Sequence, residues 1–306
     1  MKFYDRKFIY VPYGKYGWDT NTFTTPHALL LDEETIRIYG GARDKEGISR
    51  IFYIDVSAQD PSKIIKIKDK PVIDIGEKGC FDDNGMILGD ILNVDGTLYM
   101  YYVGFQHVQK VKFCAFSGLA KSIDGGESFE RVKQTPILDR TDKGRFGRCI
   151  HTVLHEDGVF KCYYAAINDW KIINDNPYPV YDIWYLESKD GINFPSYDDC
   201  HCIGTIGKEY RIGRPKVYKT DDGYEMLYTR DTIDKDYLIG RSVSKDGILW
   251  ERADDTFILR GSGKGFDSTS ANYPVRLSCK YGDYVFYSGN GMGTEGVGCC
   301  KIKSGE

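Results

Sequence analysis

An aromatic, strand-like motif recurs about once in every fifth of this 306-residue chain. Copies rich in tyrosine occupy residues 98–102, 160–164, 224–228 and 284–287, and each follows a glycine: Gly96, Gly158, Gly223 and Gly282. These glycines are 62, 65 and 59 residues apart, and a degenerate first copy lies at 36–39. The chain therefore consists of five units of similar length.

Repetition at this period predicts a radial β architecture, because one four-stranded sheet cannot bury both of its faces alone. We expect an all-β fold, a five-bladed β-propeller with four-stranded antiparallel blades, forming a single domain over residues 1–306. The blades are expected at about 20–75, 76–140, 141–200, 201–260 and 261–306. The last unit lacks one strand, so we expect residues 8–11 to supply it, closing the ring and hiding a sheet edge.

A second marker, Ser-x-Asp-Gly, follows three of the aromatic strands and places aspartates at Asp124, Asp190 and Asp246. Asp-Gly between two strand-like runs is a strong hairpin signal, because glycine adopts positive φ and the aspartate bonds the turn backbone. We interpret these aspartates as structural rather than catalytic.

Composition excludes several classes of protein. The net charge is only −4 and no basic stripe is present, so nucleic acid is not an expected partner. No signal peptide is recognisable at the start and no apolar run approaches the ~20 residues of a membrane span, which favours a cytoplasmic protein without a membrane partner. Nine scattered cysteines fit reduced thiols, and neither 200–202 nor 299–300 has the paired spacing of a zinc site.

Polar residues stand just before the apolar run that begins each unit. In a propeller these beginnings of the innermost strands converge on one axis, where polar groups need water, each other or a ligand as partners. The segments are 24–27, 81–84, 148–151, 209–215 and 266–274. We expect the binding site there.

Several short motifs make a family resemblance specific. They are Gly-Gly-Ala-Arg-Asp at 40–44, Phe-Asp-Asp at 81–83, Arg-Pro at 214–215, Asn-Tyr-Pro at 272–274 and Ser-Gly-Asn-Gly at 288–291. With the Ser-x-Asp-Gly turns, the chain resembles the five-bladed glycosidase superfamily: family 43 arabinanases and xylosidases, family 32 invertases, and family 130 mannoside phosphorylases. It looks most like uncharacterised bacterial members associated with surface-polysaccharide genes.

Inverting hydrolysis generally needs one carboxylic acid and one carboxylate about 6.5–9.5 Å apart. The family 43 resemblance implies aspartates in blades one and two and a glutamate in blade three, but this chain has Thr25, His27, Arg148 and His151 in blades one and three. The remaining catalytic candidates are Asp82, Asp83, Glu209 and Asp267. We predict that Asp83 and Glu209 form the catalytic pair and that Asp267 positions or tunes them.

Cations and imidazoles accompany these acids. Arginine forks bind phosphate and carboxylate, so the group predicts an anionic substrate or an attacking phosphate. Its members are His27, Arg43, Arg148, His151, Arg214 and Arg230, and Tyr273, Asn290 and Trp170 complete the predicted substrate-binding set. We expect Trp170 in a long loop over the pocket. The alternative is that the arginines form structural ion pairs with the acids.

The sequence thus predicts a carbohydrate-active enzyme that cleaves a glycosidic bond with inversion at a central pocket. A phosphate-dependent phosphorylase, or an enzyme of nucleotide sugars or acidic sugars, is the first alternative. A catalytically silent propeller that binds a sugar in polysaccharide biosynthesis is the second. No organic cofactor is expected; the resemblance allows an axial metal ion, but the chain offers no obvious oxygen cage for calcium.

Overall fold

The chain is all-β in the computed structural model, which describes residues 1–195, 200–234 and 237–303. It divides into two compact units, one formed by residues 1–74 and 254–306 and the other by residues 75–253. We call these unit 1 and unit 2. Residues 304–306 and 196–199, which the sequence prediction assigns to two of the blades, lie outside the described residues.

Unit 1 contains two four-stranded sheets. The first consists of β2 (Asn21–Leu30), β3 (Thr35–Arg43), β4 (Ser49–Ser57) and β5 (Ile64–Ile67) in sequence order. The second has the order β1 (Lys2–Tyr10), β20 (Val297–Lys303), β19 (Gly282–Ser288) and β18 (Asn272–Cys279). Two 3₁₀ turns (Asp254–Thr256 and Gly265–Asp267) precede β18, and a one-turn helix, α1 (Asn290–Gly293), joins β19 to β20.

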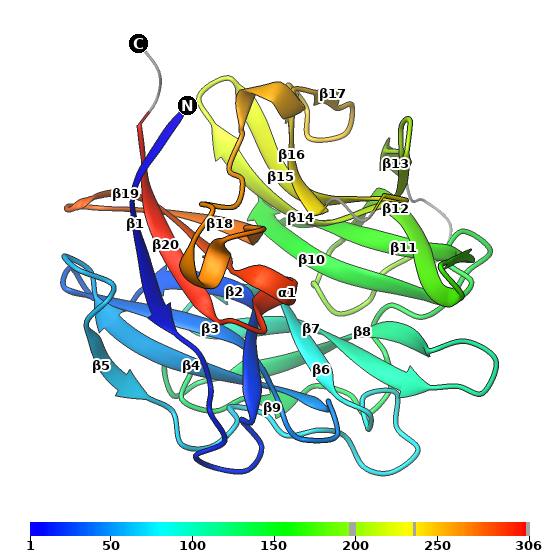
Figure 1. Cartoon of the computed structure of the whole chain (residues 1–306). Helices are drawn as coiled ribbons and strands as arrows, with labels where there is room; N and C mark the ends of the chain where they lie inside the picture. Colours follow the sequence, from blue (N-terminus) through cyan, green and yellow to red (C-terminus); the bar gives the residue numbers. More distant parts are fainter. Residues whose placement is uncertain (196–199, 235–236, 304–306) are drawn as a thin grey trace. The chain divides into compact units, whose positions relative to one another are not determined.

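The N-terminal strand completes the last sheet, as the sequence predicts. β1 runs antiparallel along β20 from the Lys2–Lys303 pair to the Tyr10–Val297 pair (Figure 1). It starts earlier than the predicted segment 8–11. The additional pairs cover more of the edge of β20, an edge that would otherwise expose unpaired backbone groups.

Unit 2 contains three further sets of four strands. They are β6 (Met86–Val94), β7 (Thr97–His107), β8 (Phe113–Ser122) and β9 (Glu130–Arg131); β10 (Gly147–Glu156), β11 (Val159–Ile173), β12 (Asn176–Ser188) and β13 (Cys200–Ile203); and β14 (Glu209–Thr220), β15 (Gly223–Thr232), β16 (Tyr237–Ser244) and β17 (Glu251–Arg252). Within each set, neighbours in sequence pair antiparallel.

The first two sets of unit 2 are joined into one eight-stranded sheet, which the sequence did not predict. β10 and β8 pair in parallel at Gly147 with Ala115 and at Arg148 with Phe116. Gly147 permits this approach, because a Cβ at this position would lie 1.9 Å from the Ala115 carbonyl oxygen. The junction fixes the start of β10 against its neighbour.

The aromatic motif forms the second strand of each set and fills the core. Tyr101, Tyr163, Tyr228 and Tyr287 are fully buried in β7, β11, β15 and β19. Buried aromatic side chains of this kind remove large areas of apolar surface from water. The sequence interpretation of the motif as sheet packing is therefore confirmed.

The three Ser-x-Asp-Gly turns are structural, as predicted. The Asp124 carboxylate accepts a hydrogen bond from the Ser128 amide at 3.1 Å, and Asp190 accepts from the Ile192 and Asn193 amides at 2.8 Å. Asp246 accepts from the Ile248 and Leu249 amides of its own turn at 2.8 and 2.9 Å. Hydrogen bonds to the ionised carboxylate lower its pKa. They hold the pKa of Asp124 at about 2 even though burial alone would raise it.

All nine cysteines are free thiols, as predicted from their scatter. Among the described residues, no helix has the length and apolarity that a membrane crossing requires.

Candidate active site

A β-bulge recurs in the first strand of every set. β2 places Thr25 and Pro26 opposite one residue of β3, β14 places Arg214 and Pro215 opposite one residue of β15, and β18 does the same with Tyr273 and Pro274. β6 and β10 carry single extra residues, Gly89 and His151. Bulges redirect side chains and are frequent beside active sites, so these positions define where ligands are expected.

Three of these bulges hold a non-glycine residue in the left-handed region. The φ angle is 53° at Thr25, 56° at Arg214 and 55° at Tyr273, and each of the three precedes a proline. Such a conformation is uncommon for any residue with a Cβ and a genuine outlier for β-branched threonine. Backbone strain of this kind concentrates at functional sites.

In unit 2 the bulges bring together a charged cluster from three strands. Arg214 of β14 donates from Nη2 to the Leu88 carbonyl of β6 at 2.9 Å, and Lys216 forms an ion pair with Asp90 of β6. Asp90 also accepts from the Val153 amide of β10 at 2.9 Å. We call His151, Arg214, Lys216 and Asp90 the central cluster.

Gly89 lets β6 approach β10 at this point. A Cβ on Gly89 would lie 2.3 Å from the Ile150 carbonyl oxygen and 2.8 Å from that of Tyr101. The extra residue of β10 follows directly, so the side chain of His151 lies in the field of both Arg214 and Asp90. The close contact of two backbones therefore positions the imidazole within the central cluster.

His151 is buried as a neutral imidazole. Burial lowers its pKa well below the usual value and the charge of Arg214 lowers it further, against the smaller opposing effect of Asp90. Only 6% of the residue is exposed, and Nδ1 has no hydrogen-bond partner among the described residues. A buried ring nitrogen without a partner is costly unless a ligand or water satisfies it.

Arg148 lies on the same strand as His151 and contacts both its own set and the neighbouring β8. It is 2% exposed, and its guanidinium carbon lies 4.9 Å from the centre of the Tyr164 ring. Its carbonyl accepts from the Ser117 hydroxyl at 2.8 Å, next to the junction with β8. The structure thus places Arg148 beneath aromatic surface rather than in the central cluster.

Asp82, a predicted catalytic residue, forms a clamp within the second set. It lies in the turn before β6 and is fully buried; Arg131 of β9 donates to Oδ2 from Nε and Nη2, both at 2.8 Å. Tyr102 of β7 donates to the same oxygen at 3.1 Å, and the Phe81 ring stacks on Tyr102 at 5.9 Å. The carboxylate thereby links the first, second and fourth strands of its sheet.

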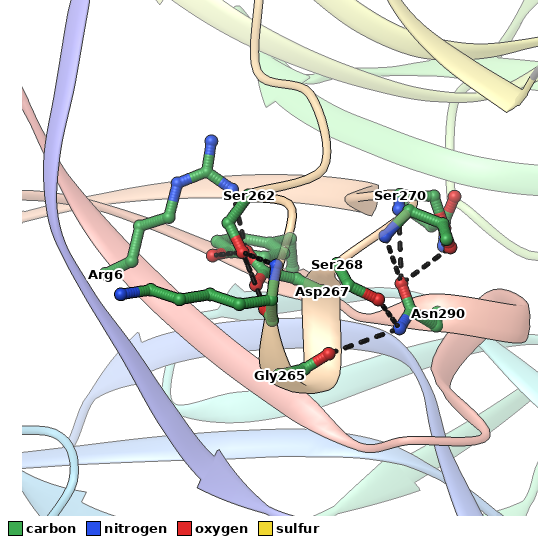
Figure 2. Close-up of polar contacts among 11 residues, drawn as sticks. Arg6, Ser262, Gly265, Asp267, Ser268, Ser270 and Asn290 are labelled. Carbon is green, nitrogen blue, oxygen red and sulfur yellow. Dashed lines mark hydrogen bonds and ion pairs between the residues drawn. The ribbon is translucent and has the colours of Figure 1, made fainter.

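Asp267 repeats this arrangement in the last sheet (Figure 2). Arg6 of β1 donates to it at 2.7 Å, Tyr287 of β19 at 2.8 Å and Ser262 at 2.6 Å. Phe266 stacks on Tyr287 at 5.7 Å, as Phe81 does on Tyr102. The sequence did not predict these two clamps, because each arginine comes from a distant outer strand.

Glu209, the predicted partner of Asp83, is also engaged by arginines. Arg230 donates to Oε1 at 2.6 Å, and Arg252 donates to the two oxygens at 2.7 and 3.0 Å. Burial raises the pKa of Glu209, but these bonds and one from the Ile206 amide outweigh it and lower the pKa below its usual value. The ion-pair alternative considered from sequence thus describes Glu209 and Arg230.

Asp83 stays half-buried in the same turn as Asp82. Its Oδ2 accepts from the Gly79 amide at 2.8 Å. The two aspartates lie in a turn and not in a strand, so their side chains need not point to opposite sides. Glu209 and Asp83 are held by separate local contacts.

The remaining predicted residues lie in unit 1 or at the edge of unit 2. His27 is buried in β2, Arg43 ends β3 opposite Asn21, and Tyr273 is half-buried at its bulge. Asn290 begins α1 and is saturated: its Oδ1 accepts from the Thr269 and Ser270 amides, and its Nδ2 donates to Ser268 at 2.9 Å (Figure 2). It therefore holds residues 268–270 in place.

Trp170 does not lie in a loop, in contrast to the prediction. It belongs to β11, which forms a long hairpin with β12. The pairing of the two strands continues from the Ile167–Tyr181 pair to the Ile173–Asn176 pair at the tip. The indole packs edge-on against Phe113 at 5.3 Å and Phe146 at 6.4 Å. Strand pairing overrode the loop signal of the Asn- and Pro-rich sequence.

Sequence reasoning missed Asp90 and Lys216. Each lies directly after the bulge of its strand, so the two residues occupy the same repeat position as each other, next to the bulge residues Gly89 and Arg214–Pro215. Aligning the five units on their bulges would have exposed both residues. In the described parts of the chain, no three His, Cys, Asp or Glu side chains gather as a metal site would require.

Comparisons with known proteins place the chain among glycoside hydrolase folds. A solved glycoside hydrolase superposes with a TM-score of 0.73 over 99% of this chain and 92% of its own, at 16% identity. A thermostable family-43 glycoside hydrolase superposes with a TM-score of 0.65 over 92% and 88%, also at 16% identity. The predicted superfamily resemblance is confirmed at the level of the fold.

The chain also has relatives by sequence. An uncharacterised protein of Mycobacterium tuberculosis is 26% identical over 297 residues, 97% of each chain. A β-1,2-mannobiose phosphorylase of Thermoanaerobacter sp. is 35% identical over 92 residues, which cover 27% of this chain and 30% of the phosphorylase. No model of a known protein family matches the chain.

Proposed function

We propose that this chain is a carbohydrate-active enzyme that cleaves a glycosidic bond with inversion, using inorganic phosphate as the attacking group at the central cluster. In this proposal the five sets of strands are the blades of a closed five-bladed propeller. The observation that carries it is the cluster itself: two cations, one carboxylate and a neutral imidazole at the bulges of three first strands.

The engaged carboxylates argue against hydrolysis by two acids. Inverting hydrolysis generally needs a second carboxylate free to activate water. Glu209 is bound by two arginines and Asp82 by one, so neither is suited to that role. Phosphorolysis needs only one acid, because the phosphate is itself the nucleophile. The partial match to a mannoside phosphorylase favours the same chemistry.

Each member of the cluster has a role in this step. Arg214 and Lys216 would bind phosphate, since guanidinium and ammonium groups are the usual partners of this dianion. A phosphate oxygen bonds to the anomeric carbon while the bond from that carbon to the leaving oxygen breaks. Asp90, as the acid, gives its proton to the leaving oxygen and regains one from the hydrogen phosphate.

Phosphate binding would also prepare Asp90 for this role. The carboxylate is paired with Lys216, which favours its ionised form. A bound dianion competes for the same ammonium group, so Asp90 becomes able to take up a proton. His151 remains neutral and offers Nδ1 to a hydroxyl of the sugar or to the phosphate.

The test is phosphate-dependent turnover of the full chain on β-1,2-mannobiose and a panel of other oligosaccharides, with release of sugar 1-phosphate as the readout. We expect no turnover without phosphate and a loss of about 10²–10⁴-fold in kcat/KM for Asp90→Asn, the range for removal of a general acid. Equal turnover in phosphate-free buffer would instead establish a hydrolase and refute the proposal.

A matched pair of lysine variants isolates the phosphate site. Lys216→Met should raise the KM for phosphate strongly, whereas Lys219→Met, on the same strand and paired with Glu156, should leave it unchanged. Asp83→Asn tests the prediction made from sequence. Loss of turnover there, with Asp90→Asn active, would transfer the acid role to Asp83.

The second candidate function is a catalytically silent sugar-binding protein. It is favoured by one observation: three of the four predicted catalytic carboxylates are held in ion pairs with arginine. In that case wild type would bind a sugar or phosphate without converting any member of the panel. Binding would then persist in Asp90→Asn, because no acid is needed.

A further inference from the structure

Two buried polar atoms at the beginnings of β2 and β18 in unit 1 have no protein partner among the described residues. They are the Thr25 hydroxyl and the Asn272 carbonyl oxygen, in residues 2% and 1% exposed. Most buried polar groups in proteins are hydrogen-bonded, so two exceptions on neighbouring strands call for an explanation.

Ser288 of β19 connects the two strands at this point. Ser288 is paired with Asn272 across β18 and β19, and its hydroxyl donates to the Phe23 carbonyl, two residues before Thr25, at 2.8 Å. Thr25 and Asn272 therefore lie on adjoining strands, each at the bulge of its own sheet.

The orientation of Asn272 is fixed by its donors. Its Nδ2 donates to the Gly289 carbonyl at 2.8 Å and to the Ser270 hydroxyl at 3.2 Å. Ser270 is itself held by Asn290, whose Oδ1 accepts from the Ser270 amide at 3.2 Å (Figure 2). With both donors used, the amide presents its carbonyl oxygen, which can only accept a hydrogen bond.

Backbone strain marks Thr25 itself and Tyr273, the residue after Asn272. Thr25 and Tyr273 have φ angles of 53° and 55°. Residues persist in such conformations only where the surrounding structure enforces them, which happens most often at ligand-binding sites. The strain and the lone polar atoms are independent observations that point to one ligand.

We propose that Thr25 and Asn272 form a binding site for the hydroxyl groups of a neutral sugar. Asn272 accepts a hydrogen bond from one hydroxyl, and Thr25 donates to or accepts from another. Neither group carries a charge, which separates this site in chemistry from the cationic central cluster of unit 2. The inference rests on the proposed function in that it takes the ligand of this site to be a sugar.

The experiment is calorimetric titration of the full chain with β-1,2-mannobiose and, separately, with inorganic phosphate. Thr25→Val keeps the branched shape and removes the hydroxyl, and Thr25→Ser, the matched control, keeps it. We expect Thr25→Val to weaken mannobiose binding about tenfold, the effect of one lost hydrogen bond, with phosphate affinity unchanged and Thr25→Ser close to wild type.

Thermal unfolding without ligand separates binding from a structural role. A hydroxyl that serves only a ligand leaves nothing unpaired when it is removed, so the Tm of Thr25→Val should equal or exceed that of wild type. If Thr25→Val fails to fold by circular dichroism, Thr25→Ala, which also lacks the hydroxyl, takes its place in both measurements.

The outcomes distinguish this inference from the proposed function. Unchanged mannobiose affinity in Thr25→Val, or no binding of mannobiose by wild type, would overturn the inference. Absence of phosphate binding, with mannobiose binding that depends on the Thr25 hydroxyl, would support it and overturn the phosphate-dependent mechanism alone.

Discussion

Replacing Asp82 by asparagine tests whether the buried aspartate before β6 stabilises its sheet or takes part in catalysis. The side chain is 1% exposed, and its Oδ2 accepts three hydrogen bonds, two of them from Arg131. Asparagine keeps the size and one acceptor but removes the charge. Arg131, whose side chain is 14% exposed, then loses this carboxylate.

The expected cost follows from these contacts. Breaking a buried ion pair by removing one partner costs about 3–5 kcal/mol. The asparagine oxygen retains neutral hydrogen bonds, each worth about 1 kcal/mol, so we expect a loss near the lower limit, about 3 kcal/mol. At roughly 2–4 °C for each kcal/mol, the Tm should fall by about 6–12 °C.

The assay is thermal unfolding of wild type and four variants: Asp82→Asn, Asp83→Asn, Arg131→Gln, and the double variant of Asp82 and Arg131. Asp83 is the matched control, because it is the neighbouring aspartate and makes one hydrogen bond to a backbone amide, so its loss should cost about 1 kcal/mol. The double variant should cost clearly less than the sum of the single variants, since both remove one interaction.

One result would refute this reasoning. If Asp82→Asn unfolds at the temperature of wild type but abolishes turnover while retaining ligand binding, Asp82 acts on the substrate and the clamp is not its function. A loss of stability together with retained turnover at low temperature would support the clamp.

Three further predictions concern the buried charges. In NMR titrations from pH 8 to 5, the His151 resonances should not shift, because burial disfavours the charged form of this imidazole. His201 should titrate above 6.5, because its hydrogen bond to Asp182 raises its pKa. Arg6→Gln should release Asp267 from β1, lower stability by about 1.5–3 kcal/mol, the range for one hydrogen bond to a charged group, and speed proteolysis of the N-terminal strand. Burial raises the pKa of Glu156, but hydrogen bonds from a tyrosine and two lysines lower it to about 2. The ionised carboxylate therefore stabilises the fold fully above pH 4.5, and this stabilisation is lost as the pH falls toward 2. Glu156→Gln should make the acid unfolding curve flatter over this range.

Local signals in the sequence were sufficient for the strands and turns. The aromatic copies became the second strands, and Asp124, Asp190 and Asp246 bond the amides of their own turns. Both outcomes depend on residues within a few positions of one another, where alternation and turn chemistry act directly. The missing strand of the last set was also predictable, because an incomplete sheet needs a partner for its edge.

The site could be predicted only in part. The repeat located the beginnings of the first strands and thereby His151 and Arg214, but the roles of the carboxylates depended on distant partners. Asp82 binds Arg131, 49 positions away, and Asp267 binds Arg6, 261 positions away. These arginines lie on the outer strands of their sheets, and only the folded sheet brings them to the carboxylates.

The central cluster likewise required the tertiary structure. Asp90 and Lys216 are 126 positions apart and meet because β6, β10 and β14 adjoin, with single-residue bulges that set where each side chain lies. A bulge is a property of the register between two strands, and a repeat pattern does not specify that register to one residue. The sequence by itself determined the repeated β units and the segments where the candidate site was expected. Long-range packing decided which partner each charged residue has, because those partners lie far apart in the sequence.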